Sequence, residues 1–520
     1  MKKYDKLVEN AAGRMVPTII NGENHMPFQG VGKYRPTGRK YGAKIPTCND
    51  FPDGNKEVNT LKEALINAGL KDGMTISSHH HFRNGDLIAK QVFDIAHDLG
   101  IKNLRWYPSA SFPCQEELIK YLEDGTINRI EGSMNGPLGK FTSEGKMKGV
   151  SILRSHGGRY QAIQDGEVKI DIAIIAAPTA DTFGNANGVN GDAACGLLGF
   201  ALADSQYAEK VIVVTDNLVP FPCIPWQIQG NYVDFVVKVD KVGLPEKIIS
   251  GTTQITKSPD RLLIAEMTAD FCEKTGLIYD GFSYQAGAGG TALSIGNYFG
   301  DILRKNNWKA RFIRAGSNKY PVELLEEGLV EYILDGQTFD LEGVRSMKEN
   351  QNHVNTSPFT SYNFHSKGNF AQFVDIVVLG ATEIDVEFNA NVVTHSDGYL
   401  LHGIGGWQNC LAAKTTIMPI PLFRDRIPVI RDRVTTLCAP GELIDVIVTE
   451  RGIAINPLRK DLIQKARSAG IELKTIHQLK EEAEKICGIP EEVILSDEIV
   501  SVIKWIDGTV IDSVKKVLTK

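Results

Sequence analysis

The sequence predicts an α/β protein made of two homologous open α/β domains in tandem, with the active-site cleft between them. Three observations support this fold class. A long segment occurs twice, Val- and Ile-rich runs of strand length alternate with helical patterns, and glycine-rich loops follow several of these runs. Continuous apolar runs separated by helices are typical of parallel strands that are buried on both faces.

The internal repeat is clearest between DIAIIAAPTADTFGNAN, residues 171–187, and DIVVLGATEIDVEFNAN, residues 375–391. The two segments are identical at seven positions without a gap. Further pairs occur in the same order at a nearly constant spacing: residues 61–77 with 263–285, 121–130 with 324–333, and 233–240 with 444–451. A repeat of this length is too long for a solenoid unit and has the size of a domain.

The repeat also divides the chain. Residues 1–55 are dense in Gly, Pro and polar residues, and they predict an N-terminal arm that is extended over a neighbouring surface or partly disordered. We expect the first domain over residues 56–255 and the second over residues 256–520. The remaining expected elements are strands at 210–217, 234–240, 375–380 and 445–450, a helix–strand–helix ending at 466–488, and a terminal hairpin at 502–517.

The composition limits the function classes. With 520 residues, 42% hydrophobic and 23% charged, the chain resembles a globular protein with a large core. A net charge of −6 argues against nucleic-acid binding, which usually needs a basic face. The first residues lack the apolar core of a signal peptide, and no apolar run is long enough to span a membrane. Eight cysteines without a C-x-x-C motif predict reduced thiols, so we expect a cytoplasmic protein.

Two glycine-rich loops are candidates for catalysis. QAGAGGTALS contains Gly287, Gly289 and Gly290, and HGIGGWQN contains Gly403, Gly405 and Gly406. Glycines let a backbone approach a ligand closely, so that successive N–H groups hold an oxyanion or a phosphate. The alternative is that the glycines only make tight turns. Neither loop fits the G-x-G-x-x-G pattern of dinucleotide binding.

Candidate substrate-binding residues lie in two further segments. SSHHHFRNGD supplies His81 and Arg83, and RSHGGRYQ supplies His156 and Arg159, which together suit an anionic substrate. A solvated surface turn is the alternative. We expect no metal, because no ligand spacing accompanies the three adjacent histidines. The remaining candidates are amides that either donate to the same cleft or cap helices: Asn187, Asn389 and Asn391.

Taken together, KIDIAIIAAPTADTFGNANG, GFSYQAGAGGTALS, LGATEIDVEFNAN and TERGIAINP resemble the family I coenzyme A transferases from about residue 56 to the C-terminus. HHHFRNGDL and SHGGRYQAIQDGE are similar, within that family, to the alpha subunits of citrate lyases. The resemblance implies a fold of the CoA-transferase type and an exchange in which an acetyl thioester and citrate give a citryl thioester and acetate. It implies no cofactor bound by this chain.

The same resemblance implies partners. The thioester would lie on the phosphoribosyl-dephospho-CoA prosthetic group of an acyl carrier (gamma) subunit. A citryl lyase (beta) subunit would then cleave the citryl thioester, and a homo-oligomer is expected. Many family I transferases use a nucleophilic glutamate in an S-E-N-G or H-T-E-M motif, whereas Ser317 and Asn318 stand at that place here.

This departure favours direct attack by a citrate carboxylate, through a mixed anhydride, over a covalent glutamyl thioester. The glycine loops would then stabilise the oxyanions, and His81, Arg83, His156 and Arg159 would position the anions. Three alternatives remain open: a free-standing CoA transferase or acyl-CoA hydrolase, a malonate decarboxylase acyl-transfer subunit, and a non-enzymatic sensor of the same fold.

Overall fold

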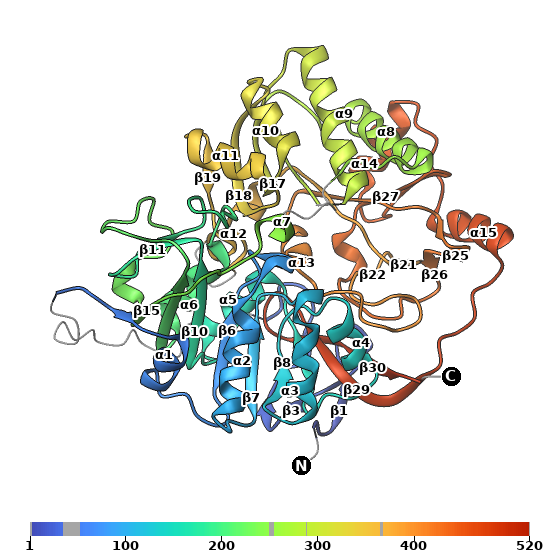
Figure 1. Cartoon of the computed structure of the whole chain (residues 1–520). Helices are drawn as coiled ribbons and strands as arrows, with labels where there is room; N and C mark the ends of the chain where they lie inside the picture. Colours follow the sequence, from blue (N-terminus) through green and yellow to red (C-terminus); the bar gives the residue numbers. More distant parts are fainter. Residues whose placement is uncertain (1–2, 35–52, 249–253, 288, 364–367, 519–520) are drawn as a thin grey trace.

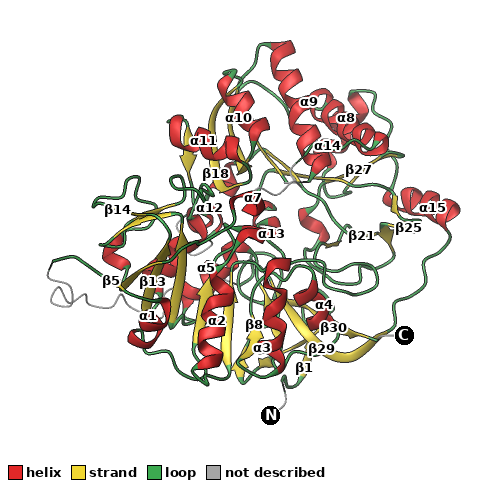
Figure 2. Ribbon diagram, viewed as in Figure 1, coloured by secondary structure: helices red, strands yellow, loops and turns green. Residues whose placement is uncertain are grey.

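The computed structural model describes residues 3–34, 53–248, 254–287, 289–363 and 368–518. Two large β-sheets, each flanked by helices, form the two halves of the molecule (Figures 1 and 2). The first sheet is formed by the blue to green part of the chain in Figure 1, and the second by the yellow to orange part. The α/β fold class is therefore confirmed.

The first sheet consists of parallel strands in the order β5-β15-β13-β10-β6-β7-β8. Its central strand β10 reads IAIIAA and is buried along its whole length, as a strand covered by helices on both faces must be. The strands are β5 (Glu57–Val58), β6 (Thr75–Ser78), β7 (Leu104–Pro108), β8 (Ile127–Ile130), β10 (Ile172–Ala177), β13 (Lys210–Thr215) and β15 (Phe235–Lys238).

The second sheet has the order β19-β18-β17-β16-β20-β23-β27-β28, with β28 antiparallel to β27. The order β8-β7-β6-β10-β13-β15 of the first sheet recurs here as β18-β17-β16-β20-β23-β27. The exact domain boundaries at residues 55 and 255 remain predictions. The strands are β16 (Ser283–Ala286), β17 (Ala310–Ser317), β18 (Val330–Thr338), β19 (His353–Asn355), β20 (Ile376–Val378), β23 (Thr415–Pro419), β27 (Val446–Thr449) and β28 (Gly452–Ile455).

A small three-stranded sheet accompanies each large sheet, with order β12-β11-β14 in one half and β22-β21-β26 in the other. These strands carry the polar ends of the repeated segments. They are β11 (Thr179–Asp181), β12 (Ala186–Asn187), β14 (Leu218–Val219), β21 (Glu383–Asp385), β22 (Ala390–Asn391) and β26 (Ile430–Arg431). A two-stranded ribbon adds β24 (Phe423–Arg424) and β25 (Ile427–Pro428).

The two ends of the chain pack together against the first half (Figure 1). The terminal hairpin, β29 (Leu495–Lys504) with β30 (Val510–Val517), is confirmed, and β29 pairs in parallel with β9 (Ser151–Leu153). The described part of the N-terminal arm forms two hairpins, and Phe28 donates its backbone N–H to Val510. These N-terminal strands are β1 (Leu7–Glu9), β2 (Met15–Pro17), β3 (Ile19–Ile20) and β4 (Glu23–Asn24).

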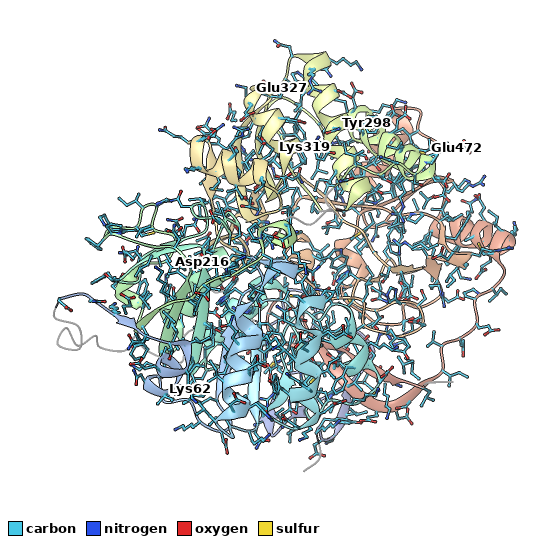
Figure 3. All side chains as sticks on the ribbon, viewed as in Figure 1. Lys62, Asp216, Tyr298, Lys319, Glu327 and Glu472 are labelled. Carbon is cyan, nitrogen blue, oxygen red and sulfur yellow. The ribbon has the colours of Figure 1, made fainter. Side chains whose placement is uncertain are left out.

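Helices cover both faces of the sheets, and side chains fill the space between the layers (Figures 2 and 3). In the first half these are α1 (Leu61–Asn67), α2 (Ile88–Asp98), α3 (Ile119–Glu123), α4 (Pro137–Ser143), α5 (His156–Asp165), α6 (Leu202–Tyr207) and α7 (Pro245–Ile248). In the second half they are α8 (Pro259–Lys274), α9 (Gly290–Asn306), α10 (Lys319–Glu326), α11 (Leu341–Glu349), α12 (Pro358–Tyr362), α13 (Trp407–Cys410), α14 (Lys460–Ser468) and α15 (Ile476–Cys487).

Residues 466–488 differ from the expected helix–strand–helix ending. The end of α14 and α15 are present, but only a single bridge between Leu473 and Ile453 lies between them, so the expected strand is wrong. None of the helices in the described ranges is long and apolar enough to cross a membrane. The seven cysteines of these ranges are free thiols, and Cys48 lies outside the described residues.

Candidate active site

A cavity of about 390 Å³ lies between the two halves, where α5, α12 and α13 meet at the centre of Figure 1. The first half contributes His156 and Phe200 to its wall. The second half contributes the ends of strands β16 and β17 and the loop that precedes α13. The cavity therefore lies at the carboxyl ends of parallel strands, where open α/β sheets usually bind their ligands.

A buried arginine, Arg314, is the main charged group of this cavity. It lies on β17, is 1% exposed, and its guanidinium group stacks over the ring of Tyr362 at 3.7 Å from the centroid. Its Nη1 donates to Gln285 Oε1 at 3.1 Å and to the Tyr362 hydroxyl, which are both neutral acceptors. Its Nε has no hydrogen-bond partner among the described residues.

This arrangement leaves a buried positive charge that the neighbouring side chains do not neutralise. A buried charge is stable only when it is paired and hydrogen-bonded, so the cavity is suited to an anion. Gln285 Nε2 also donates to the Tyr362 hydroxyl and to Cys410 Sγ, both at 2.9 Å, which fixes these groups around the guanidinium. Burial raises the pKa of the Cys410 thiol, which opposes a thiolate nucleophile.

His156 joins the two halves at the edge of the cavity. Its backbone N–H, at the start of α5, donates to the carbonyl oxygen of Gly405 at 2.7 Å. The ring stacks on His80 at 5.8 Å and meets Phe200 edge-on at 4.7 Å. Burial, and then the positive charges of Arg159 and Arg314, lower the pKa of His156 to about 3. The imidazole is therefore neutral at neutral pH.

The glycines of the second loop have different roles in the wall of the cavity. Gly403, Gly405 and Gly406 all line it. Gly405 has φ +61°, a conformation that favours glycine, and Gly406 is the N-cap of α13. No described residue accepts a hydrogen bond from the N–H of Gly405 or Gly406, so both amides are available to a ligand. A Cβ on Gly403 would lie 1.9 Å from Ser133 Oγ, so this glycine also allows the two halves to pack closely.

The glycines of the first loop are less available. Gly287 lines the cavity, but its N–H already donates to Val378 at 3.1 Å. Gly290 is the first residue of α9, and a Cβ there would lie 2.8 Å from the carbonyl oxygen of Gln254, which indicates a packing role. Gly289 is the N-cap of α9, and neither it nor Gly290 lines the cavity. The loop therefore offers a ligand fewer free amides than its sequence predicts.

The basic candidates of the first half are held by other protein groups. Arg159 donates to both oxygens of Asp204 at 2.6 Å. Arg83 lies over the ring of Phe339, which lines the cavity, at 4.4 Å from its centroid. His81 Nε2 lies 2.6 Å from the carbonyl oxygen of Ala176. These three side chains form the structure behind the wall rather than the wall itself.

The asparagine candidates stabilise the repeated loops. Asn389 donates to Asp385 and accepts from the N–H of Gly441, and Asn391 donates to Glu383. In the first half Asn187 donates to Cys223 Sγ and accepts from the N–H of Val189. None of the three lines the cavity. This structural role explains why both copies of the repeat carry them.

Several cavity residues were not predicted from the sequence: Gln285, Arg314, Tyr362, His402 and Cys410. Two of them had a visible signal, because Gln285 directly precedes the first glycine loop and Arg314 interrupts the apolar strand pattern ARFIRAGS. Tyr362 lies on a short helix whose sequence gives no indication of the cavity.

Ser317 and Asn318, which replace the expected glutamate, are buried and already engaged. Ser317 Oγ donates to Asp335 Oδ2 at 2.5 Å, and the Asn318 side chain accepts from the N–H of Tyr320 at the start of α10.

Among the described residues there is no group of His, Cys, Asp and Glu side chains that would hold a metal. The cavity thus presents a buried guanidinium without a charged partner among the described residues, and two backbone amides that no described residue engages.

A family profile described as "Citrate lyase, alpha subunit (CitF)" matches residues 54–517. The chain is 40% identical to the citrate lyase alpha chain of Escherichia coli strain K12 over 88% of this chain and 90% of that protein. It is 38% identical to the citrate lyase alpha chain of Haemophilus influenzae, over 94% of this chain and 99% of that protein. These matches cover both halves and the residues of the cavity.

Solved structures agree with the sequence matches. A structure from Streptococcus mutans, described as the alpha subunit of citrate lyase in complex with citrate, superposes with a TM-score of 0.93. It is 39% identical, and the alignment covers 98% of this chain and 100% of that chain. A malonate decarboxylase alpha subunit from Acinetobacter baumannii gives a TM-score of 0.62 at 16% identity over 85% and 92% of the two chains, which shows a shared fold.

Proposed function

Because the chain belongs to the citrate lyase alpha subunit family, we propose that it is the citrate CoA-transferase of a cytoplasmic citrate lyase complex. It exchanges acetate for citrate on the thiol of an acyl carrier subunit, so that acetyl carrier and citrate give citryl carrier and acetate. The carrier's phosphoribosyl-dephospho-CoA thioester is a substrate brought by that partner. A second partner, the lyase subunit, then cleaves the citryl thioester. The likeness to malonate decarboxylase shows the fold alone and favours no other activity.

The observation that carries this proposal is the buried guanidinium of Arg314. Its Nε lacks a partner among the described residues, and its bound acceptors are neutral. A carboxylate of citrate supplies the missing charge, because carboxylates match the planar donors of arginine. The relative from Streptococcus mutans was solved with citrate bound, which supports a carboxylate ligand in this family.

The exchange proceeds in two steps that need no protein nucleophile. A citrate carboxylate oxygen attacks the acetyl carbonyl, and the C–S bond breaks to give a citric–acetic anhydride and the carrier thiolate. The thiolate then attacks the citryl carbonyl of the anhydride, and the C–O bond breaks to release acetate. The N–H groups of Gly405 and Gly406 are free to donate to the oxyanion of each tetrahedral intermediate.

The surroundings of the cavity are consistent with this route. Ser317 and Asn318 have side chains engaged by Asp335 and by the backbone of α10, so neither replaces the family's glutamate. His156 is neutral at neutral pH, so the positive charge that faces the carboxylate comes from Arg314. Holding both reactants in one cavity supplies the effective concentration that the attack needs.

The test is the transfer of radiolabelled citrate to acetyl carrier protein by the purified chain. We expect Arg314→Gln to lower kcat/KM for citrate about 10- to 100-fold, since a hydrogen-bonded charge contributes about 1.5–3 kcal/mol. Arg311→Gln, an exposed change on the same strand, serves as the matched control and should leave exchange unchanged. Equal loss in both variants, or a glutamyl adduct trapped by borohydride, would overturn the proposed mechanism.

A further inference from the structure

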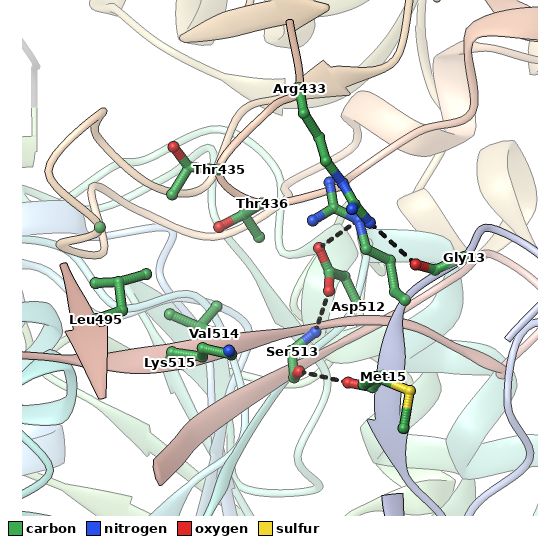
Figure 4. A pocket seen from close by; sticks show the side chains of 12 residues that line it. Gly13, Met15, Arg433, Thr435, Thr436, Leu495, Asp512, Ser513, Val514 and Lys515 are labelled. Atoms are coloured by element: carbon green, nitrogen blue, oxygen red, sulfur yellow. Dashed lines mark hydrogen bonds and ion pairs between the residues drawn. The ribbon is translucent and has the colours of Figure 1, made fainter. Parts of the chain in front are cut away.

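A second cavity, of about 320 Å³, lies away from the first, where the two ends of the chain meet (Figure 4). Most of its wall comes from three segments that are far apart in the sequence, and Gly398 and Leu495 complete it. The first comprises Gly13 to Met15 at the start of β2, and the second is the loop after β26. The third is β30, between Asp512 and Lys515. The cavity is nearly as large as the one around Arg314, so it accommodates a small molecule of similar size.

The wall of this second cavity is positively charged, although the chain as a whole has a net charge of −6. Arg14, Arg433 and Lys515 line it, and the single carboxylate in the described wall is Asp512. Each basic residue comes from a different segment. A positive cavity on a negative protein concentrates anions locally.

Asp512 offsets only part of this positive charge. It is buried, and its two oxygens accept from the N–H groups of Leu437 at 2.6 Å and Ser513 at 2.8 Å. It also forms an ion pair with Arg14 Nε at 3.5 Å, and the charge of Arg433 favours its ionised form more weakly. One carboxylate thus faces three basic residues, so the wall keeps a net positive charge.

The other two cations have weak partners. Figure 4 shows Arg433 extending from its loop to the carbonyl oxygen of Gly13, at 2.9 Å, which is a neutral acceptor. Lys515 is half exposed and lies 3.8 Å from Asp497, a fully exposed carboxylate, so this ion pair is weak. Both side chains can turn toward a ligand without breaking a buried interaction.

We propose that this cavity binds a small polyanion with at least two carboxylate or phosphate groups. Arginine provides paired donors for either group, and Lys515 adds a third positive charge from β30. Because the three cations lie directly before β2, on the loop after β26 and on β30, a bound polyanion links the N-terminal hairpin to the second half and to the terminal hairpin. The site is separate from the citrate cavity and does not depend on the proposed exchange reaction.

The experiment is isothermal titration calorimetry of the full chain with inorganic pyrophosphate at constant ionic strength. The binding variant is Arg433→Gln/Lys515→Gln, which removes two exposed charges and leaves the Arg14–Asp512 pair intact. Lys516→Gln is the matched control, because Lys516 is the next residue of β30, pairs with Glu498 and does not line the cavity. Arg314→Gln tests whether the probe instead occupies the citrate cavity.

We expect one pyrophosphate to bind to the wild type, to Lys516→Gln and to Arg314→Gln with similar affinity. The affinity of the double variant for pyrophosphate should be at least tenfold lower. Thermal unfolding should show the same order, since a ligand of the folded state raises Tm. No binding to the wild type, or a loss in Arg314→Gln instead of the double variant, would overturn the proposal. Hexaglutamate serves as a second probe, and tighter binding of this peptide than of pyrophosphate would reject a small molecule as the ligand.

Discussion

The backbone N–H of His156 donates to the carbonyl oxygen of Gly405 at 2.7 Å and so joins the two halves of the chain at the wall of the cavity around Arg314, the proposed citrate cavity. His156 begins α5, and Gly405 directly precedes the N-cap of α13. The bond fixes the peptide on one side of Gly405 while the N–H groups of Gly405 and Gly406 stay free. The position of the proposed oxyanion donors thus depends on a contact between distant parts of the sequence.

Gly405→Ala should reduce citrate exchange more than tenfold. Gly405 has φ +61°, so a side chain strains the loop by about 1 kcal/mol and displaces the amides. The measurement is kcat/KM for citrate together with Tm. Gly328→Ala is the control, because Gly328 also has a positive φ of +76° but lies in an open turn. This variant should lower Tm by a similar amount and leave citrate exchange unchanged. Equal kinetic effects in the two variants would argue against a catalytic role of the loop.

Tyr362→Phe should raise KM for citrate several-fold with a smaller effect on kcat. The hydroxyl accepts from Arg314 and Gln285, and without it the guanidinium loses an acceptor and its fixed orientation. Steady-state kinetics with varied citrate measures the split between KM and kcat. Tyr298→Phe on α9 provides the comparison, since Tyr298 does not line the cavity. An unchanged KM in Tyr362→Phe would show that this hydroxyl does not contribute to citrate binding.

Asp204→Asn should destabilise the fold more than it affects the chemistry. It leaves buried Arg159 without its carboxylate, and breaking one partner of a buried ion pair costs about 3–5 kcal/mol. Arg159 and His79 hold the pKa of Asp204 well below its usual range, although burial opposes this shift. The variant should therefore unfold at lower urea concentration at pH 7. Unchanged stability would contradict a structural role for the pair.

His81 should make the folded state sensitive to acid below pH 6.5. Burial, and then the nearby His79, lower the pKa of His81 from 6.5 to about 3. Because the unfolded chain takes up this proton first, stability is complete above pH 6.5 and falls as pH decreases toward 3. Between pH 7 and pH 5 the loss is about 2 kcal/mol. Urea unfolding at the two pH values measures this loss. The free energy of unfolding should change less between pH 7 and pH 5 in His81→Gln than in His477→Gln, a variant at an exposed site.

Citrate should protect Cys410 from small thiol reagents. The thiol is buried in the cavity wall, and its pKa is raised by burial, so it should react slowly even without citrate. Cys487 is partly exposed at the end of α15 and should react first without loss of exchange. Peptide mapping after timed alkylation, with and without citrate, measures both rates. Equal labelling of Cys410 in the two conditions would place citrate elsewhere.

The sequence by itself determined the local structure. Runs such as IAIIAA in β10 and VIVT in β27 are apolar throughout, and this pattern is sufficient to predict strands that are buried on both faces. The repeated Asp and Asn residues were also visible, and in both copies they stabilise the same loop, as Asp181 does with Asn185 and Asp385 with Asn389. The C-terminal hairpin is predictable because the Asp507-Gly508 turn between two apolar runs is a local feature.

Only the tertiary structure decided which of several similar groups remain available to a ligand. Arg159 and Arg314 are both buried arginines, but Asp204 neutralises the first while the second has only neutral acceptors. The amides of Gly287 and Gly405 look equivalent in sequence. The Gly287 N–H donates to the carbonyl oxygen of Val378, whereas no described residue accepts a hydrogen bond from the Gly405 N–H. The reason is physical: backbone periodicity is set by neighbouring residues, whereas the partners that neutralise a charge or occupy an N–H come from distant segments.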